Sequence, residues 1–344
     1  MKYRLSTNVI SAVAFLVSLT MMGWSCDPCD GWGAEASTVL KCVQSQTKED
    51  VLAIPEIKNY LNKHKVYISL TSSPKRISKI LPVLQSLDLK LVTHIFLVLP
   101  LTFQNKPGAD YLIPEEIKKF EKLQILRIKE DLGPITKLLP AIAYVNNSEE
   151  NRQAGIKFVL DTPAPLNPAD PNAIVITIDD DVVYYRGAIS QFIKHAILKD
   201  SVVTGGGYNV AHWGIDRTRG WPQQEIAEPL CRLFPLSSCD LIEGWAGVAY
   251  KAKHVNVSLM KKLSVLGKDQ GNKSCFISDD LVIGFGLAKA GVQRLMVRNQ
   301  YAYEPIPLDI GFQDDALHLG GDAGKDYNYQ KYPDCFNNYL KDFR

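Results

Sequence analysis

The sequence predicts an α/β protein with a mostly parallel sheet and helices on both of its faces. Short apolar runs rich in β-branched residues, at 66–70, 94–99 and 173–178, are typical of strands. Segments with apolar residues at helical spacing, such as 76–87 and 187–198, separate these runs along the chain. The nearly continuous apolar run at 173–178 favours a strand that is covered on both faces. Strands that alternate with helices in this way indicate a parallel, Rossmann-type sheet.

The remaining elements continue the same alternation. We expect further helices at 114–123, 135–144 and 281–288, and further strands at 123–128 and 201–204. Ligands of such sheets bind beyond the carboxyl ends of the strands. The polar residues that directly follow an apolar run are therefore the first candidates for a functional site.

Length and charge limit the classes of function. After the N-terminal leader about 300 residues remain, enough for one large domain, which we place at 61–344. The net charge is +2, and no basic stripe alternates with aromatic residues, so nucleic acid is not an expected partner.

The N-terminus predicts export. Lys2 and Arg4 precede a mostly apolar run at 9–24, which is shorter than the roughly 20 residues of a comfortable membrane span. We therefore interpret residues 1–25 as a signal peptide or a weak signal anchor and residues 26–60 as a stem or linker. The expected location is the secretory pathway or a membrane to which the N-terminus attaches.

The cysteines agree with an oxidising compartment. Cys26 and Cys29 form a Cys-x-x-Cys pair that is either incidental or a local disulfide, because no second pair follows at zinc-finger spacing. Four further cysteines in the main domain are compatible with two disulfides, namely Cys231, Cys239, Cys275 and Cys335.

Three consecutive aspartates, Asp179, Asp180 and Asp181, follow the apolar run at 173–178 directly. If the strand continued through them, Asp179 and Asp181 would point to one side and Asp180 to the other. Adjacent carboxylates repel one another, and a divalent cation removes this cost; oxygen ligands suit Mn²⁺ or Mg²⁺. The alternative, a solvated acidic turn, is disfavoured because the run before the aspartates predicts a buried strand.

From this motif onward the sequence resembles the glycosyltransferases of the GT-A fold, which carry a DXD motif, and most of all family 2-like enzymes. Four further segments match the pattern in order: 70–76 after the first strand, 130–138 with Gly-Pro-x-x-Lys, 244–251 with Gly-Trp-Ala-Gly, and the acidic segment 278–284. The resemblance covers about residues 65–297.

The resemblance implies a metal-assisted transfer of a sugar from a nucleotide-diphosphate-sugar donor to a hydroxyl of a glycan, lipid or protein. It implies roles for the following residues: donor binding by Thr71, Ser73, Arg76, Lys137, Asp179 and Asp180; metal binding by Asp179, Asp181 and His318; substrate binding by Gly244, Trp245 and Gly247; and catalysis by Asp279 and Asp280.

Plainer roles remain open for several of these residues. Lys137 and Arg76 suit solvated surface positions, Trp245 suits a buried core position, and His318 suits a packed or surface position. Asp279 suits a helix N-cap, with Asp280 as the general base of an inverting transfer.

Two other functions fit parts of the sequence. A phosphohydrolase of the haloacid dehalogenase type would use Asp179 as nucleophile and the later aspartates for Mg²⁺, although its acidic motif normally opens the domain. A secreted carbohydrate-binding protein would keep the fold without the chemistry, because a fold alone does not establish activity.

Overall fold

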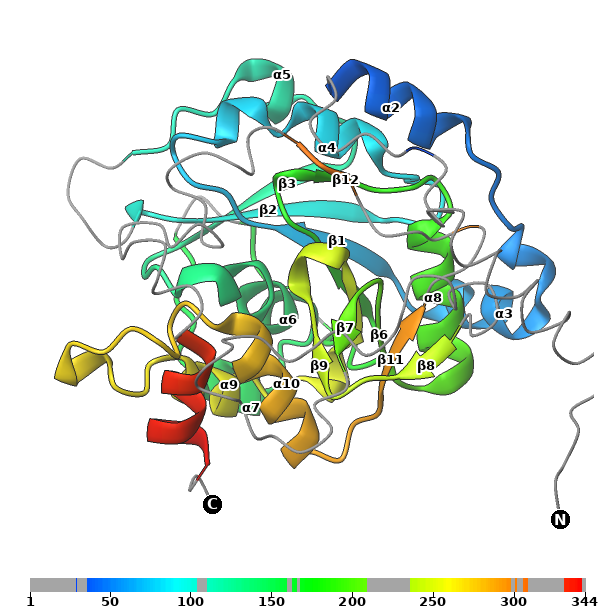
Figure 1. Ribbon diagram of the computed structural model, residues 1–344. Helices are drawn as coiled ribbons and strands as arrows, with labels where there is room; N and C mark the ends of the chain where they lie inside the picture. Colours follow the sequence, from blue (N-terminus) through cyan, green and yellow to red (C-terminus); the bar gives the residue numbers. More distant parts are fainter. Residues whose placement is uncertain are drawn as a thin grey trace, which may run out of the picture.

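The protein is an α/β domain built on one large sheet (Figure 1). The computed structural model describes residues 29, 36–103, 110–159, 163–165, 168–208, 236–297, 301, 306–308 and 331–341. Within these residues the large sheet has eight strands in the order β3-β2-β1-β4-β10-β6-β11-β8. Their bounds are β1 Val66–Leu70, β2 His94–Pro100, β3 Leu123–Ile128, β4 Ile174–Thr177, β6 Val202–Thr204, β8 Leu236–Ser238, β10 Val248–Lys251 and β11 Arg294–Val297.

The first half of the sheet is parallel throughout. Strand β1 pairs in parallel with β2 on one side and with β4 on the other, and β2 pairs in parallel with β3. Strand β10 runs antiparallel between β4 and β6, and β11 then returns parallel to β6. Two short pairs, β5 (Val182–Val183) with β12 (Ile306–Pro307) and β7 (Gly207–Tyr208) with β9 (Leu241–Ile242), lie outside the large sheet. This mostly parallel arrangement confirms the predicted fold class.

Helices cover both faces of the sheet (Figure 1). One apolar core contains residues of α2 (Ala36–Ser45), α4 (Leu81–Ser86) and α8 (Ala188–Lys199). The other contains residues of α6 (Leu139–Val145), α9 (Val257–Ser264) and α10 (Asp279–Lys289). The other helices and turns are η1 Val51–Ala53, α3 Pro55–Lys63, η2 Ile77–Lys79, α5 Glu115–Lys118, η4 Gly133–Lys137, α7 Glu149–Gln153, η6 Gly244–Ala246, η7 Ala252–His254, η8 Lys268–Gln270 and η12 Phe336–Leu340.

The carboxyl ends of β1 and β4 meet at one edge, as predicted. Ser69 is registered against Thr177, and the Ile178 amide donates to the Ser69 carbonyl over 3.0 Å. The loop that begins at residue 71 and the aspartates that begin at residue 179 therefore start side by side.

Two predicted helices begin later than their apolar spacing indicates. The segment predicted as a helix at 76–87 is a 3₁₀ turn followed by α4, and the segment at 135–144 overlaps η4 and α6 in the same way. Pro82 and Pro140 lie in the first turns of α4 and α6. Because proline lacks an N–H and is tolerated only in the first turn, each α-helix starts just before its proline.

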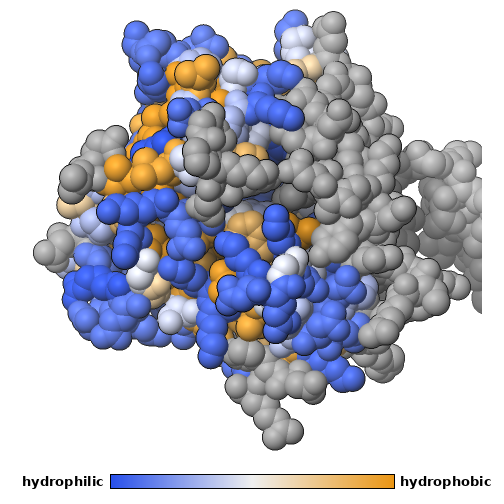
Figure 2. Space-filling model, turned by 90° about the vertical axis from the view of Figure 1, so that its left-hand side faces the viewer, coloured by the Kyte–Doolittle hydropathy of each residue, from blue (hydrophilic) through white to orange (hydrophobic). Residues whose placement is uncertain are grey.

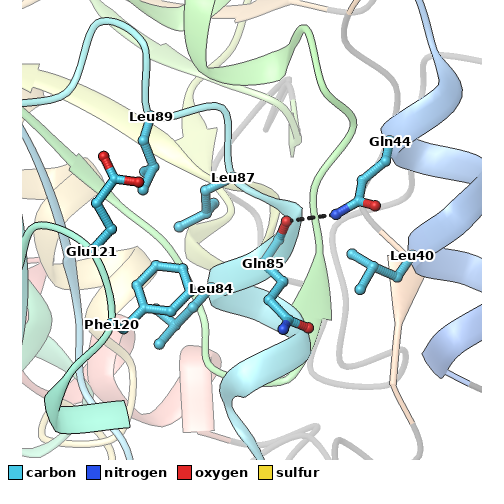
Figure 3. A pocket seen from close by; sticks show the side chains of 8 residues that line it. All are labelled: Leu40, Gln44, Leu84, Gln85, Leu87, Leu89, Phe120 and Glu121. Atoms are coloured by element: carbon cyan, nitrogen blue, oxygen red, sulfur yellow. Dashed lines mark hydrogen bonds between the residues drawn. The ribbon is translucent and has the colours of Figure 1, made fainter. Parts of the chain in front are cut away.

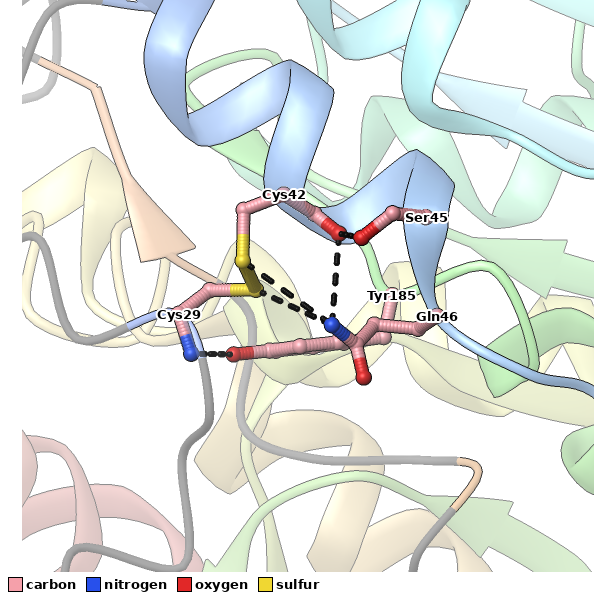
Figure 4. The surroundings of a disulfide bond; sticks show 5 residues. All are labelled: Cys29, Cys42, Ser45, Gln46 and Tyr185. Atoms are coloured by element: carbon pink, nitrogen blue, oxygen red, sulfur yellow. Dashed lines mark hydrogen bonds between the residues drawn. A yellow bond between two sulfur atoms is a disulfide. The ribbon is translucent and has the colours of Figure 1, made fainter.

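The described part of the predicted linker packs against the domain. Val39 and Val43 of α2 are buried in the first core, and Ile57 of α3 is fully buried. A disulfide joins Cys29 to Cys42 of α2, and the Cys29 amide donates to the Tyr185 hydroxyl over 3.3 Å (Figure 4). These contacts show that residues 36–60 are not an extended linker. The signal in the sequence that could have predicted these helices is the spacing of apolar residues within 36–60.

The cysteine pairing differs from the simplest expectation. Cys29 pairs with Cys42 and not with Cys26, which lies outside the described residues together with Cys231. Cys275 pairs with Cys335, which ties the C-terminal segment to the loop before α10. Cys239 is free and buried, so the described residues contain one of the two disulfides expected in the main domain.

The surface is mostly hydrophilic on the face shown in Figure 2, where apolar residues gather mainly in the upper part. Among the described residues the large apolar side chains with the greatest exposure are Leu101, Leu112 and Leu198. No helix in the described part of the chain is long and apolar enough to cross a membrane. The predicted leader at 1–25 lies outside the described residues.

The packing of α3 predicts that Ile57→Ala destabilises the domain by about 2–5 kcal/mol, because it removes a fully buried side chain and leaves a cavity. The measurement is urea unfolding, read as a lower midpoint with an unchanged slope. The neighbouring exposed residue gives the control, and Lys58→Ala is expected to change stability by less than about 0.5 kcal/mol. Equal, small effects of both variants would mean that α3 is a loosely attached linker.

Candidate functional site

The three aspartates form a link between strands and are not part of one. Strand β4 ends at Thr177 and β5 begins at Val182. The prediction that Asp180 points away from its two neighbours is wrong, because strand alternation has ended: both Asp180 and Asp181 face Arg76. Asp179 turns instead toward Lys137, whose Nζ lies 2.6 Å from its Oδ1.

Arg76 holds two carboxylates together. Its Nε donates to Asp180 Oδ2 over 3.2 Å, its Nη2 contacts Asp180 Oδ1, and its Nη1 donates to Asp181 Oδ2 over 3.1 Å. The Ser72 hydroxyl also donates to Asp180 Oδ2, so this buried carboxylate is well supplied with donors. Arg76 follows β1 and the aspartates follow β4, so the parallel pairing of these strands creates the contact.

Burial raises the pKa values of two of these aspartates. Burial raises the pKa of Asp180 despite the opposing charge of Arg76 and the Ser72 hydrogen bond. Burial and the charges of Asp180 and Asp179 raise the pKa of Asp181 to about 7. These carboxylates are therefore in an environment that disfavours their charged form.

Lys137 connects the two acidic segments of the sequence. Its Nζ bonds Asp179 and lies 3.3 Å from Asp279 Oδ2, although the chain positions of these acids are 100 apart. Lys137 is buried, and the Ser69 hydroxyl of β1 donates to its carbonyl over 2.5 Å, which fixes the end of η4 against the sheet. Burial lowers the pKa of Lys137, but the charges of Asp179, Asp279 and Asp280 outweigh that effect and raise it well above its usual value.

Asp279 and Asp280 form the first turn of α10. Ser278 is the N-cap residue, so Asp279 is already inside the helix and the prediction that it caps the helix is wrong. Acidic side chains are favoured in a first turn because they face the positive end of the helix dipole. Asp279 Oδ2 is buried. It forms an ion pair with Lys137, but the geometry of this contact is not that of a hydrogen bond.

Asp280 is bound at both of its oxygens. The Gly244 amide donates to Oδ1 over 2.8 Å, and the Tyr332 hydroxyl donates to Oδ2 over 3.3 Å. Burial and the charges of Asp279 and Asp179 raise the pKa of Asp280 to about 8, against the opposing effects of Lys137 and the Gly244 amide. A carboxyl with this pKa can accept a proton near neutral pH.

The Gly-Trp-Ala-Gly segment lies against this acid. A Cβ on Gly244 would stand 2.8 Å from both Asp280 Oδ1 and Lys137 Nζ, so only glycine lets the backbone approach so closely. Gly247 has φ +83, and Tyr184 packs beside it and donates to the Trp245 carbonyl over 2.7 Å. The Trp245 ring is only partly buried, and its Nε1 donates to Glu243 over 3.0 Å.

We call Asp179, Asp180, Asp181, Asp279 and Asp280 together the acidic cluster. In the described part of the chain, three buried or mostly buried cations interact with it: Arg76, Lys137 and Lys331. Among the described residues these carboxylates outnumber the cations. Burial first, and then the neighbouring aspartates, raise the pKa values of Asp181 and Asp280. Carboxylate oxygens with uncompensated charge fit Mn²⁺ or Mg²⁺ by donor type. The described residues contain no group of three or more potential ligands already arranged around one metal position.

The structure brings together most of the residues singled out in the sequence. The bonds described above join Arg76 to Asp180 and Asp181, Lys137 to Asp179 and Asp279, and Gly244 to Asp280. Thr71 and Ser73 are partly buried in the loop after β1. His318 lies outside the described residues, so its assignment as a metal ligand stays a prediction.

Sequence reasoning missed four contributors. Ser72, whose hydroxyl donates to Asp180, was not among the predicted site residues. Its place among three consecutive polar residues directly after a strand was the signal that could have identified it. Tyr184, Lys331 and Tyr332 carry no motif, and their place beside the cluster follows only from the fold.

A cavity of about 500 Å³ lies elsewhere, between α2, α4 and the end of α5 (Figure 3). Its lining combines apolar side chains, such as Leu40 and Phe120, with the polar side chains of Gln44, Gln85 and Glu121. No member of the acidic cluster lines it, so it is separate from the candidate site.

Comparison with known proteins gives little further information. No protein-family model matches the sequence, and no curated protein matches it. Among solved structures the chain is similar to one described as the crystal structure of GalNAc-T7 with UDP, GalNAc and Mn²⁺, with a TM-score of 0.35 and 10% identity. The match covers 81% of this chain and 57% of the other, so this chain spans little more than half of that structure's length. A likeness this distant does not assign an activity.

The pairing of Arg76 predicts a pH-dependent loss of stability in Arg76→Met. Without metal, the variant leaves Asp180 as a buried charge without its counterion, which costs about 3–5 kcal/mol. An acid whose pKa is raised by folding destabilises the protein increasingly as pH rises from its unfolded pKa to the raised pKa. Loss of Arg76 raises the pKa of Asp180 further, so the loss of stability is expected to be larger at pH 8 than at pH 5.

Urea unfolding in EDTA at both pH values measures this difference. Arg152→Met is the matched control, because Arg152 forms an exposed pair with Glu149 that contributes about 0–1 kcal/mol. Similar losses for both variants, or a loss independent of pH, would contradict the role given to Arg76.

Proposed function

We propose that the protein is a metal-assisted glycosyltransferase that moves a sugar from a nucleotide-diphosphate-sugar donor to a hydroxyl acceptor. One observation supports this most strongly: the aspartates after β4 and the aspartates of α10 meet across Lys137 at the carboxyl edge of the sheet. A reaction of this kind needs both a site for a diphosphate and a base for a hydroxyl, and the two acidic segments supply them separately.

The donor diphosphate is assigned to the side of the site formed by the loop after β1 and the link after β4. Asp179 and Asp181 are the residues that would hold Mn²⁺ or Mg²⁺, and His318 is retained as a further candidate ligand. A bound divalent cation offsets the charge that develops on the leaving diphosphate. Arg76 and Lys137, both next to these acids, are the side chains placed to contact phosphate oxygens.

The acceptor is assigned to the side formed by α10 and the Gly244 loop. The acceptor oxygen attacks the anomeric carbon, the bond from that carbon to the diphosphate oxygen breaks, and the acceptor proton passes to Asp280. The Gly244 amide keeps the Asp280 carboxylate oriented for this transfer. A base in this position favours inversion at the anomeric carbon.

The partly exposed ring of Trp245 is the candidate surface for the sugar. The acceptor is a glycan, lipid or protein hydroxyl. The predicted N-terminal leader and the disulfides fit an enzyme of the secretory pathway or one attached to a membrane.

The metal role predicts that Asp181→Ala abolishes Mn²⁺-dependent turnover of nucleotide sugars while the protein stays folded. The measurement is release of nucleoside diphosphate from a panel of UDP- and GDP-sugars, with and without Mn²⁺, together with thermal unfolding. Asp50→Asn, an exposed position, is the control.

Wild-type turnover in Asp181→Ala would contradict the assignment. Hydrolysis of p-nitrophenyl phosphate that depends on Asp179, without turnover of nucleotide sugars, would instead favour a phosphohydrolase. Binding of UDP with Mn²⁺ but no turnover of any donor would favour a non-catalytic binding protein.

The base role predicts a rate that rises with pH. Because the carboxylate form of Asp280 accepts the proton, kcat should rise about tenfold per pH unit below the pKa near 8 and level off above it. Asp280→Asn should lower transfer by about 10²–10⁴-fold, the usual contribution of a general base, and leave donor binding nearly unchanged. Equal losses of transfer and of donor binding would remove the base role.

A further inference from the structure

The C-terminal segment reaches the acidic cluster. Residues 331–335 are helical and continue into η12, and this short helix lies beside α9 and α10 (Figure 1). Cys335 is fully buried and forms the disulfide with Cys275, four positions before Asp279 on the chain. Tyr332 and Leu340 are buried in the same core as α10. The segment is therefore fixed to the part of the chain that carries the proposed base.

Two donors fix the Asp280 carboxylate from opposite elements. The Gly244 amide occupies Oδ1, and the Tyr332 hydroxyl from the C-terminal segment occupies Oδ2. The amide belongs to a glycine loop whose position is set by the sheet, whereas the hydroxyl depends on the disulfide-bonded segment. Because the Gly244 amide holds one oxygen and the Tyr332 hydroxyl holds the other, the two hydrogen bonds together fix the plane of the Asp280 carboxylate.

The same segment brings a cation to the cluster. Lys331 is 6% exposed, and its charge interacts with those of Asp280 and Asp279. Burial lowers the pKa of Lys331, and these carboxylates oppose that effect. A cation near Asp280 favours the charged form that a base needs.

We propose that the C-terminal segment held by the Cys275–Cys335 disulfide completes the active site, and that Tyr332 is a positioning residue for the Asp280 carboxylate. This inference rests on the proposed function for its catalytic meaning, while the contact itself can be tested without any turnover. It assigns a role in the site to a part of the chain about fifty residues beyond the last acidic motif.

The sign of the effect follows from the contact. A hydrogen bond donated to a carboxylate favours its charged form, so its loss raises the pKa of Asp280. The charged and titratable groups that face Asp280 or its Tyr332 contact are Lys137, Asp179, Glu243, Asp279 and Lys331. None of them is removed in Tyr332→Phe, so the shift in this variant reports the hydroxyl alone.

The experiment compares Tyr332→Phe with the wild-type chain and with Tyr339→Phe. Tyr339 lies in the same segment, and its hydroxyl contacts Gln270 on the exposed side, so the control removes the same atom from a contact that does not involve Asp280. We expect Tyr332→Phe to move the acid limb of the kcat profile about one pH unit upward and to lower kcat at pH 7 about tenfold. The KM for the donor and the Kd for UDP with Mn²⁺ should change less than twofold.

A second variant tests the anchor. Cys275→Ser combined with Cys335→Ser should lower kcat at least as much as Tyr332→Phe, again with little change in the Kd for UDP with Mn²⁺. A pH limb that stays in place in Tyr332→Phe, or that moves equally in Tyr339→Phe, would overturn the positioning role.

A readout without turnover separates this inference from the proposed function. The pKa of Asp280 is measured by carboxyl ¹³C NMR titration, with Asp280→Asn used to assign the signal. A higher pKa in Tyr332→Phe than in the wild type and in Tyr339→Phe supports the contact even if no nucleotide sugar is turned over, in which case only the proposed function fails. An unchanged pKa in Tyr332→Phe refutes the inference whatever the activity.

Discussion

The candidate site depends on the ion pairs of Lys137 with Asp179 and Asp279. Ionised carboxylates are costly to bury unless each has a partner, and here two acidic segments from distant parts of the chain share one buried amine. The surrounding residues position Lys137 and leave space for it. Ser69 of β1 holds the Lys137 carbonyl, and the missing side chain of Gly244 leaves room for the Lys137 Nζ.

The remaining negative charge connects this arrangement to function. Arg76 satisfies Asp180 with two of its nitrogen atoms and reaches Asp181 with a third. The pKa values of Asp181 and Asp280 are nevertheless raised, because burial and neighbouring acids outweigh the nearby cations. In the proposed function, one side of this site binds a cation with a diphosphate and the other side accepts a proton.

The fold was largely predictable from the sequence, and the details of the site were less so. The strand β3 matches the apolar run at 123–128, and α8 differs by one residue at each end from the helical spacing at 187–198, because the apolar residues of both segments recur at clear spacings. The packing of α2 and α3 against the domain was missed, since short amphipathic helices in a polar segment resemble a linker.

Within the site, the motifs gave the right acids but not their directions. Strand alternation failed at Asp180 because β4 ends two residues before the first aspartate. Lys331 and Tyr332 were not predictable from the sequence, because they lie beside Asp280 only through the fold. The disulfide between Cys275 and Cys335 holds their segment near α10. Residues that act through tertiary placement leave no periodic or motif signal in one sequence.

In the proposed function, the aspartates after β4 hold a divalent cation that carries a nucleoside diphosphate. Anomalous diffraction from a crystal soaked with Mn²⁺ and UDP locates the metal without relying on activity. We expect a Mn²⁺ peak within bonding distance of an Asp181 oxygen, with the diphosphate next to Arg76 or Lys137. A fully occupied Mn²⁺ site away from these aspartates, or UDP bound at another edge of the sheet, would refute the proposed metal site.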